Sequence, residues 1–406
     1  MKKETIINTL VLNGPLIYFS IFALLGYRAD PEEGAGITYK IYMVSILLLG
    51  VFLWIRGVLR NSNKLGRAFP FFVLLIYIIT GMLQGYSDHR LFLQMVCFSV
   101  PATCIALNMK GRDELAEVMK LMDLLIPIFA VSFIFMVRNI YASSLENTGS
   151  YNQNASYMIA YCFLIDVFLL FNNKSYPKFR FLDKKWYTIF KIILLPYFVV
   201  LSFFGGGRGA FITILVGSFI AFWVNRKQIS PKMIIKVSLI LIVSVGLLVL
   251  VLGKLSEGFH TLLSDNFERI TSLVDNGSIN ASASSGRDEI WKDAWKLISD
   301  NPILGYGLFS YLSKIMWPHN LFLEVLLQGG FVFLIFFVFV LFLAFNKYRR
   351  MIKLDKAQIW LIPLMVHVFT QLLFSGSYMF ETYFWFSLTY IYNYRFIKKR
   401  KSSGMK

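Results

Sequence analysis

Apolar runs of roughly 17 to 22 residues recur along the chain, and a helix of this length crosses the hydrocarbon core of a bilayer. Short polar connections separate the runs. The pattern predicts an all-α integral membrane protein, a polytopic helical bundle of about twelve transmembrane helices. The predicted spans are residues 7–26, 38–58, 68–86, 91–108, 119–138, 155–172, 187–204, 209–225, 233–253, 319–345, 358–375 and 380–396.

One polar connection, residues 254–318, is too long for a simple connector, and loops of this length usually carry function. A short amphipathic helix is predicted inside it. Ser285 followed by Asp288 resembles a capping box, and Trp291, Trp295 and Ile298 recur at helical spacing. The Asn-Pro pair that follows ends this helix. The chain has no internal repeat, so residues 1–406 are expected to form a single membrane domain that includes this loop.

Composition and charge fix the orientation of the spans. The chain has 406 residues, of which 57% are hydrophobic and only 16% charged, which fits a membrane protein. Its net charge of +18 does not indicate nucleic-acid binding, because the basic residues form short clusters between spans. Alternate connections, including both ends of the chain, hold 30 of the 41 Lys and Arg residues. The positive-inside rule therefore predicts cytoplasmic termini and an extracytoplasmic loop at 254–318.

Two arginines are candidates for binding a phosphate group. Arg208 stands in the sequence Gly-Gly-Gly-Arg-Gly between two spans, where a charge at the membrane surface usually faces a polar cavity. Arg287 falls in the first turn of the predicted loop helix, where unpaired N–H groups and the helix dipole favour an anion. The alternatives are a glycine turn with a snorkelling Arg208, and an exposed Arg287 that pairs with Asp288 or Glu289.

His319 is the candidate for proton transfer. It follows Pro318 and opens the predicted span 319–345, and a helix N-terminus favours the neutral imidazole, which can accept a proton. Asn320 could orient His319 or hold a sugar hydroxyl, and Glu324, somewhat over one turn deeper, could orient either residue. The alternatives are an ordinary interfacial histidine and a helix–helix hydrogen bond for Glu324.

Weaker candidates lie near the same face or inside the spans. Asn154 could contact a sugar or cap its helix, and Tyr306 could stack on a sugar ring or belong to the interfacial aromatic belt. Asp166, His367 and Glu381 are ionisable groups in or near spans that could line a cavity.

Charge parity places Arg208, Arg287 and His319 on one side of the membrane, although they are far apart in the sequence. This set suits transfer from a pyrophosphate-activated donor. The arginines would neutralise the charge on the leaving pyrophosphate, and the histidine would take the proton of the attacking hydroxyl. The sequence has no P-loop, no HExxH and no Asp-rich motif, so no metal and no cofactor are expected.

Four motifs follow one another in a fixed order across residues 200–345: a Gly-Arg-Gly turn, an Arg-x-x-x-Trp helix, an Asn-Pro-x-x-Gly-x-Gly segment and a His-Asn pair. This ordered set resembles the motifs of the O-antigen ligase/polymerase superfamily. The members of that superfamily are bacterial integral-membrane glycosyltransferases of the GT-C type. The N-terminal half of the chain is similar only in its span layout and around Asn154.

The resemblance implies a substrate, an oligosaccharide on undecaprenyl pyrophosphate presented at the extracytoplasmic face of the bacterial inner membrane. Arg208 and Arg287 would then bind the pyrophosphate, and His319 would activate the acceptor hydroxyl or position the sugar. The expected partners are this lipid-linked glycan, the bilayer, and a chain-length regulator or flippase of the same pathway.

Three activities are compatible with this resemblance and layout. We expect a polymerase that joins lipid-linked repeat units, and the alternative is a ligase that moves the glycan to lipid A–core or another acceptor. A transporter or flippase is a third reading. Transporters usually show two related halves, whereas the halves of this chain do not match and its polar residues gather in one outer loop.

Overall fold

The computed structural model describes residues 3–24, 37–61, 89–109, 114–144, 151–172, 178–204, 208–227 and 287–396, with a few positions between 243 and 279. The predicted span 68–86 lies outside the described residues, and so does the predicted span 233–253 apart from two isolated positions. So do Ser285 of the predicted capping box and the glycines at 205–207.

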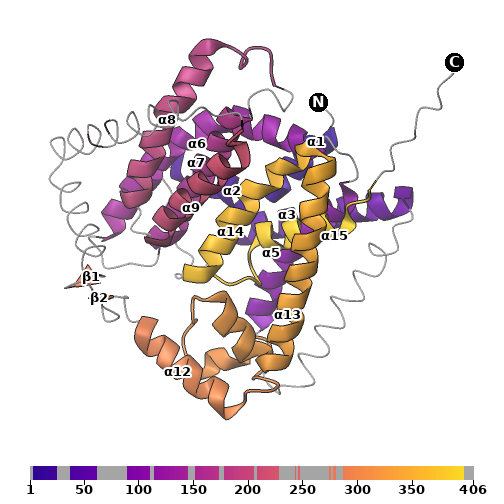
Figure 1. The fold of residues 1–406 in the computed structure, drawn as a ribbon, viewed down its shortest axis with the longest axis vertical. Helices are drawn as coiled ribbons and strands as arrows, with labels where there is room; N and C mark the ends of the chain where they lie inside the picture. Colours follow the sequence, from indigo (N-terminus) through magenta and orange to yellow (C-terminus); the bar gives the residue numbers. More distant parts are fainter. Residues whose placement is uncertain are drawn as a thin grey trace.

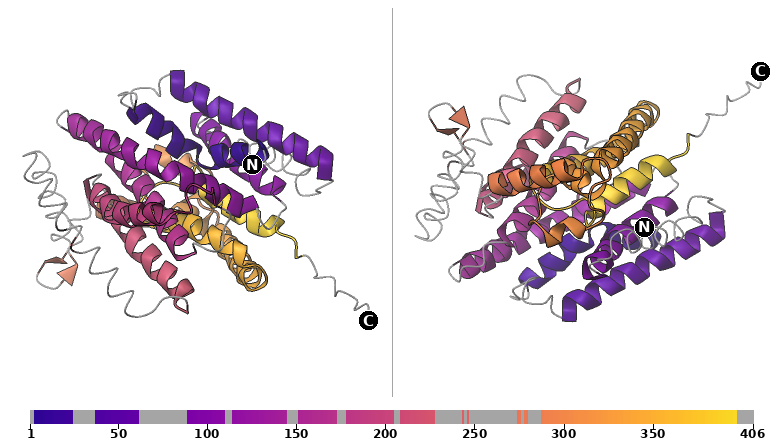
Figure 2. Two further views of the ribbon diagram at one scale, coloured as in Figure 1. Left: turned by 90° about the horizontal axis from the view of Figure 1, so that it is seen from above. Right: turned by 90° about the horizontal axis from the view of Figure 1, so that it is seen from below.

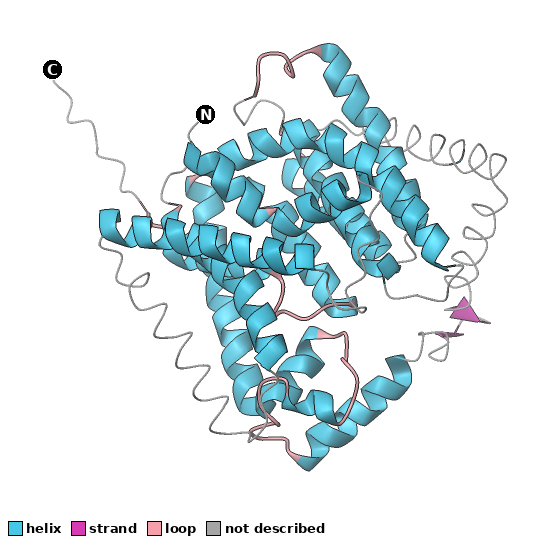
Figure 3. Ribbon diagram, turned by 180° about the vertical axis from the view of Figure 1, so that it is seen from behind, coloured by secondary structure: helices cyan, strands magenta, loops and turns pink. Residues whose placement is uncertain are grey.

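Nearly all of the described chain is helical (Figure 3). The helices are α1 (Lys3–Leu12), α2 (Gly14–Leu24), α3 (Ile37–Asn61), α5 (His89–Asn108), α6 (Glu114–Ser144), α7 (Tyr151–Phe171), α8 (Lys185–Phe204), α9 (Arg208–Asn225), α12 (Arg287–Asp300), α13 (Leu321–Leu354), α14 (Leu361–Phe374) and α15 (Thr382–Asn393). The other described elements are the 3-10 helices η2 (Ser310–Ser313) and η3 (Lys356–Trp360) and the paired antiparallel strands β1 (Val274–Asp275) and β2 (Ser278–Ile279).

Seven helical segments within the described residues are long and apolar enough to cross a membrane. The prediction of a polytopic helical bundle is therefore confirmed. Helix α7 is central, because it packs against α6, α8, α9 and α14, whereas α3 lies along one edge of the bundle (Figure 2). Helix α12 lies at one end of the bundle, below the lower ends of α9 and α14 in Figure 1.

The first predicted span, residues 7–26, is divided into α1 and α2. Pro15 has no N–H group to continue the helical ladder, which explains an interruption at this point. The Asn13 side chain at the junction is fully buried, and its Oδ1 accepts hydrogen bonds from the hydroxyls of Tyr161 (3.0 Å) and Tyr383 (3.1 Å). The junction therefore has its polar group satisfied inside the bundle.

Helix α13 is also interrupted, at Gly329 and Gly330, where the backbone angles are not helical. In a continuous helix, the carbonyls of residues 327 and 328 would accept from the N–H groups of residues 331 and 332. Here the loop after α12 supplies partners to all four groups. The bonds are Tyr306 N to Leu327 O (2.7 Å), Gly307 N to Gln328 O (2.7 Å), Phe331 N to Pro302 O (2.8 Å) and Val332 N to Ile303 O (3.3 Å).

The glycines of the two segments make this close approach possible. Gly330 has φ +61°, and a Cβ atom there would lie 2.3 Å from the carbonyl carbon and oxygen of Ile303. Gly305 has φ +63°, and its Cβ would lie 2.7 Å from the backbone nitrogens of Gly329 and Gly330. The Asn-Pro-x-x-Gly-x-Gly segment thus fills the break in α13, which holds the loop against the start of that helix.

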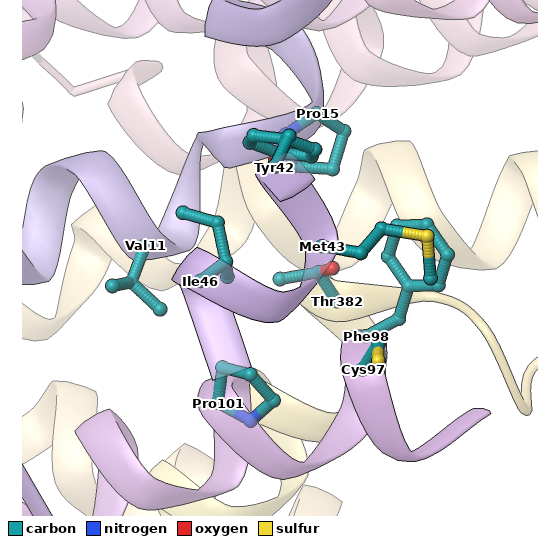
Figure 4. A pocket seen from close by; sticks show the side chains of 9 residues that line it. All are labelled: Val11, Pro15, Tyr42, Met43, Ile46, Cys97, Phe98, Pro101 and Thr382. Atoms are coloured by element: carbon teal, nitrogen blue, oxygen red, sulfur yellow. The ribbon is translucent and has the colours of Figure 1, made fainter. Parts of the chain in front are cut away.

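A small pocket lies among α1, α2, α3, α5 and α15 (Figure 4). Tyr42 and Met43 of α3, Cys97 of α5 and Thr382 of α15 are among its lining residues. No charged side chain lines this pocket, so it does not suit a pyrophosphate group.

Candidate functional site

Helix α12 carries the first element of the site. It begins at Arg287, as the sequence predicted. Ala294 and Ile298 are its buried residues, and the partly buried Trp291 packs against them. Trp295 was predicted on this apolar face, but it is 51% exposed. The reason is the helical period, because a residue next to Ala294 is turned by about 100° from it.

A hydrogen bond joins α12 to the segment before α13. Nε1 of Trp291 donates to the carbonyl of Pro318 at 2.8 Å. Arg287 and Trp291 are one helical turn apart and share a face of α12. The bond therefore holds the turn that carries Arg287 against the residue that precedes His319, and it explains the Arg-x-x-x-Trp spacing.

The sequence predicted that His319 opens the helix. In the structure, α13 begins at Leu321 and Asn320 is its N-cap, so His319 lies before the helix. His319 has φ +48°, a left-handed conformation that is uncommon for a residue with a side chain. Oδ1 of Asn320 accepts from the backbone N–H groups of Phe322 (3.0 Å) and Leu323 (3.2 Å). Asn320 thus caps α13, and its contact with a sugar stays a prediction.

Burial and a neighbouring charge set the protonation of His319. Burial lowers the pKa of His319 below its ordinary value, and the Arg287 guanidinium lowers it further. The effect of the helix N-terminus, which the sequence suggested, stays a prediction. Nδ1 of His319 has no hydrogen-bond partner within the described part of the chain. A neutral imidazole at pH 7 has a free nitrogen that can accept a proton.

Arg287 itself lies half-buried beside α7. Burial lowers the pKa of the Arg287 guanidinium, and the nearby Tyr157 opposes this shift. A guanidinium keeps its charge in proteins, so Arg287 brings a positive charge to a partly desolvated position. Asn154, exposed in the first turn of α7, is three residues before Tyr157 and lies on the same side of that helix. Its contact with sugar stays a prediction.

The first turn of α9 reaches the same place. A Cβ atom at Gly209 would lie 1.8 Å from the hydroxyl oxygen of Tyr157 and 3.0 Å from Cβ of Phe374. Arg208 begins this helix, and its side chain lies outside the described part of the structure. The backbone at Arg208 therefore stands next to the tyrosine that neighbours Arg287, so three distant parts of the sequence meet here.

No contact of Glu324 or Tyr306 with Arg287 or His319 is described. Glu324 is 1% exposed, and its Oε1 accepts hydrogen bonds from Nε2 of Gln328 (3.2 Å) and from the Ser377 hydroxyl. The first bond lies within α13 and the second joins α13 to the segment between α14 and α15, so neither is a helix–helix hydrogen bond, and a substrate contact for Glu324 stays a prediction. The Tyr306 hydroxyl donates to the carbonyl of Leu297 (3.0 Å), ten residues after Arg287 and about 15 Å along the helix.

Two further ionisable groups named from the sequence, Asp166 and His367, are buried. Asp166 is fully buried in α7, where Lys191 and Asp123 are its charged neighbours. His367 is 4% exposed, and its ring lies 5.0 Å from that of Tyr161, 5.5 Å from that of Tyr383 and 6.4 Å from that of Tyr157, the tyrosine beside Arg287. Neither residue has a described contact with Arg287 or His319. Within the described ranges, no group of three His, Cys, Asp or Glu residues could hold a metal ion.

Tyr157 and the Trp291 hydrogen bond were missed at the level of sequence. The spacing of three residues from Asn154 could have indicated Tyr157, because both fall in the first two turns of one span. No local signal could have indicated the partner of Trp291, since Pro318 is 27 residues away.

The fold and site define a multi-pass membrane protein with arginine and histidine side chains gathered at one end of its helices. Residues 192–338 match the family model described as O-antigen ligase. The matched region includes Arg208, Arg287 and His319. This match confirms the resemblance to the O-antigen ligase/polymerase superfamily and supports a membrane enzyme of the glycosyltransferase type. No curated protein and no solved structure matches the chain.

Proposed function

We propose that this protein is a surface-polysaccharide polymerase of the O-antigen type. It transfers an undecaprenyl-pyrophosphate-linked glycan to a sugar hydroxyl of a lipid-linked repeat unit. The observation that carries the proposal is the pairing of Arg287, at the start of α12, with a neutral and partly buried His319, within a region that matches O-antigen ligases.

In the proposed reaction, Arg287 and Arg208 bind the pyrophosphate of the donor. The acceptor hydroxyl oxygen attacks the anomeric carbon of the donor sugar, and the bond from that carbon to the pyrophosphate oxygen breaks. His319 takes the hydroxyl proton, and undecaprenyl pyrophosphate leaves with its negative charge neutralised by the arginines. A positioned general base of this kind typically accelerates a reaction by about 10²–10⁴-fold.

The proposal includes a location in the bacterial inner membrane, with both termini in the cytoplasm and the site at the extracytoplasmic face. The distribution of Lys and Arg among the connections supports this orientation. The donor pyrophosphate would then lie at the membrane surface, where Arg287 and the start of α9 meet, while its lipid chain stays in the bilayer.

A ligase is the second candidate, because the matching family model is described as O-antigen ligase. A ligase would use the same donor and the same arginines, but a different acceptor, such as lipid A–core. The two activities therefore differ in the final product rather than in the chemistry of the donor.

Deletion of the gene followed by glycan profiling separates these candidates. Loss of a polymerase leaves lipid A–core that bears one repeat unit, which is the expected result. Loss of a ligase leaves polymer on undecaprenyl pyrophosphate. An unaltered glycan together with altered solute uptake would contradict both activities and indicate a transporter.

A further inference from the structure

The segment between α14 and α15 borders the site on the side of His319. Nδ2 of Asn320, the residue after His319, donates to the carbonyl of Leu373 at 3.4 Å. The ring of Trp317, two residues before His319, lies 5.5 Å from the ring of Phe380. The chain around His319 is therefore in contact with both ends of residues 373–380, outside the region that matches the O-antigen ligase model.

The same segment also borders the side of Arg208. A Cβ atom added at Gly209, the residue after Arg208, would lie 3.0 Å from Cβ of Phe374. Residues 373–381 thus lie against the chain at both His319 and Arg208. Glu381 is the charged side chain of this segment, and it directly follows Phe380.

The Glu381 carboxyl group is held in a defined position. Its Oε1 accepts a hydrogen bond from Nε2 of Gln371 at 2.7 Å. Gly376 has φ +70°, and a Cβ atom there would lie 3.2 Å from this same oxygen. The Tyr157 hydroxyl, which neighbours Arg287, borders the same segment, because a Cβ atom at Gly209 would lie 1.8 Å from that hydroxyl oxygen and 3.0 Å from Cβ of Phe374. The site therefore has an acidic group opposed to its arginines.

The chemistry of a carboxyl group decides what it can bind here. Its oxygens accept hydrogen bonds from neutral hydroxyl groups, whereas an ionised pyrophosphate has no hydrogen to donate to it and is bound by the arginines instead. In the proposed reaction, the hydroxyl-bearing molecule that must be oriented toward the anomeric carbon is the acceptor. We propose that Glu381 binds a hydroxyl group of the acceptor sugar, an inference that rests on the proposed function.

The test uses the purified full-length protein and Glu381→Gln. The new amide oxygen can still accept from Gln371, so the bond between α14 and the start of α15 is kept while the charge is lost. The probe is the free repeat-unit oligosaccharide, released by mild acid from the lipid-linked intermediates of cells that lack this protein. Binding is followed by tryptophan fluorescence, and binding of undecaprenyl pyrophosphate is measured in parallel.

We expect Glu381→Gln to weaken binding of the oligosaccharide about 10-fold, the effect of losing one hydrogen bond. Binding of undecaprenyl pyrophosphate should stay unchanged. The matched control is Glu117→Gln on α6, which removes a partly exposed carboxylate 3.8 Å from Lys120 and should have no effect on either ligand. Glu381→Asp, which keeps the charge and shortens its reach, should bind the oligosaccharide with intermediate affinity.

Three results would overturn the assignment of Glu381. They are unchanged oligosaccharide binding in Glu381→Gln, a loss confined to undecaprenyl pyrophosphate, and an unmodified protein that does not bind the oligosaccharide. If Glu381→Gln does not fold, Glu381→Asp takes its place in the test. The assignment is then overturned if Glu381→Asp binds the oligosaccharide as tightly as the unmodified protein does. Failure of the proposed function is a separate outcome, because it appears as an unaltered glycan in the deletion strain.

Discussion

Gly330→Ala tests whether the break in α13 holds the site together. The added methyl group would lie 2.3 Å from the carbonyl carbon and oxygen of Ile303, and neither backbone atom belongs to a flexible side chain that could move away. The residue also has φ +61° and ψ −162°, a region that is essentially restricted to glycine. Residues 302–307 must therefore move away from α13 or α13 must change its path.

The expected cost follows from these contacts. A residue with a side chain in this backbone region costs about 1–3 kcal/mol. Displacement of the loop would also weaken or break the four hydrogen bonds between residues 302–307 and 327–332, each of which contributes about 1 kcal/mol. The free energy of unfolding should therefore fall by about 2–7 kcal/mol, a large fraction of the stability of a typical protein.

Thermal unfolding of the purified protein in detergent measures this loss. Gly330→Ala should unfold at a temperature several degrees lower than the unmodified protein. The matched control is Gly246→Ala, because a Cβ atom at Gly246 would meet no heavy atom of the described residues within 4 Å. If the two variants unfold at the same temperature, the close contact between Gly330 and Ile303 is refuted.

Two further predictions concern the charges of the site and the orientation of the bundle. Arg287→Ala removes a positive charge that disfavours the imidazolium form, so the pKa of His319 should rise. The acid limb of the pH dependence of the residual kcat/KM should then move to higher pH, and an unchanged limb would show that Arg287 does not act on His319. A reporter protein inserted near residue 280 should be active only outside the cytoplasm, because the basic clusters lie in the alternate connections. Activity of that reporter in the cytoplasm would contradict this orientation, because the site would then lie on the cytoplasmic side of the membrane.

Seven of the predicted spans correspond to helices long and apolar enough to cross a membrane, because bilayer thickness fixes the length of an apolar helix. The interruption of α13 was not predictable in the same way. Gly329 and Gly330 lie inside an apolar run that is compatible with a continuous helix, and Gly is common in transmembrane helices. The break depends on a loop from elsewhere in the chain, residues 302–307, whose backbone groups replace the missing helical bonds.

The site was predictable in its parts but not in its assembly. A capping pattern placed Arg287 at the start of a helix, and the structure confirms the position. His319 was expected inside the helix, but the side chain of Asn320 takes the capping position and leaves His319 in a left-handed conformation before it. Glu381 was one of several ionisable groups near a span. Its place beside the site follows only from the tertiary contacts of its neighbours.

The central claim is that His319 accepts the proton of the attacking sugar hydroxyl. The most direct measurement incubates the reconstituted, purified protein with lipid-linked repeat units and follows the length of the glycan on undecaprenyl pyrophosphate. The unmodified protein should produce glycans of two or more repeat units, and His319→Ala, at the same protein level, should produce none above background. Full elongation by His319→Ala would contradict the account.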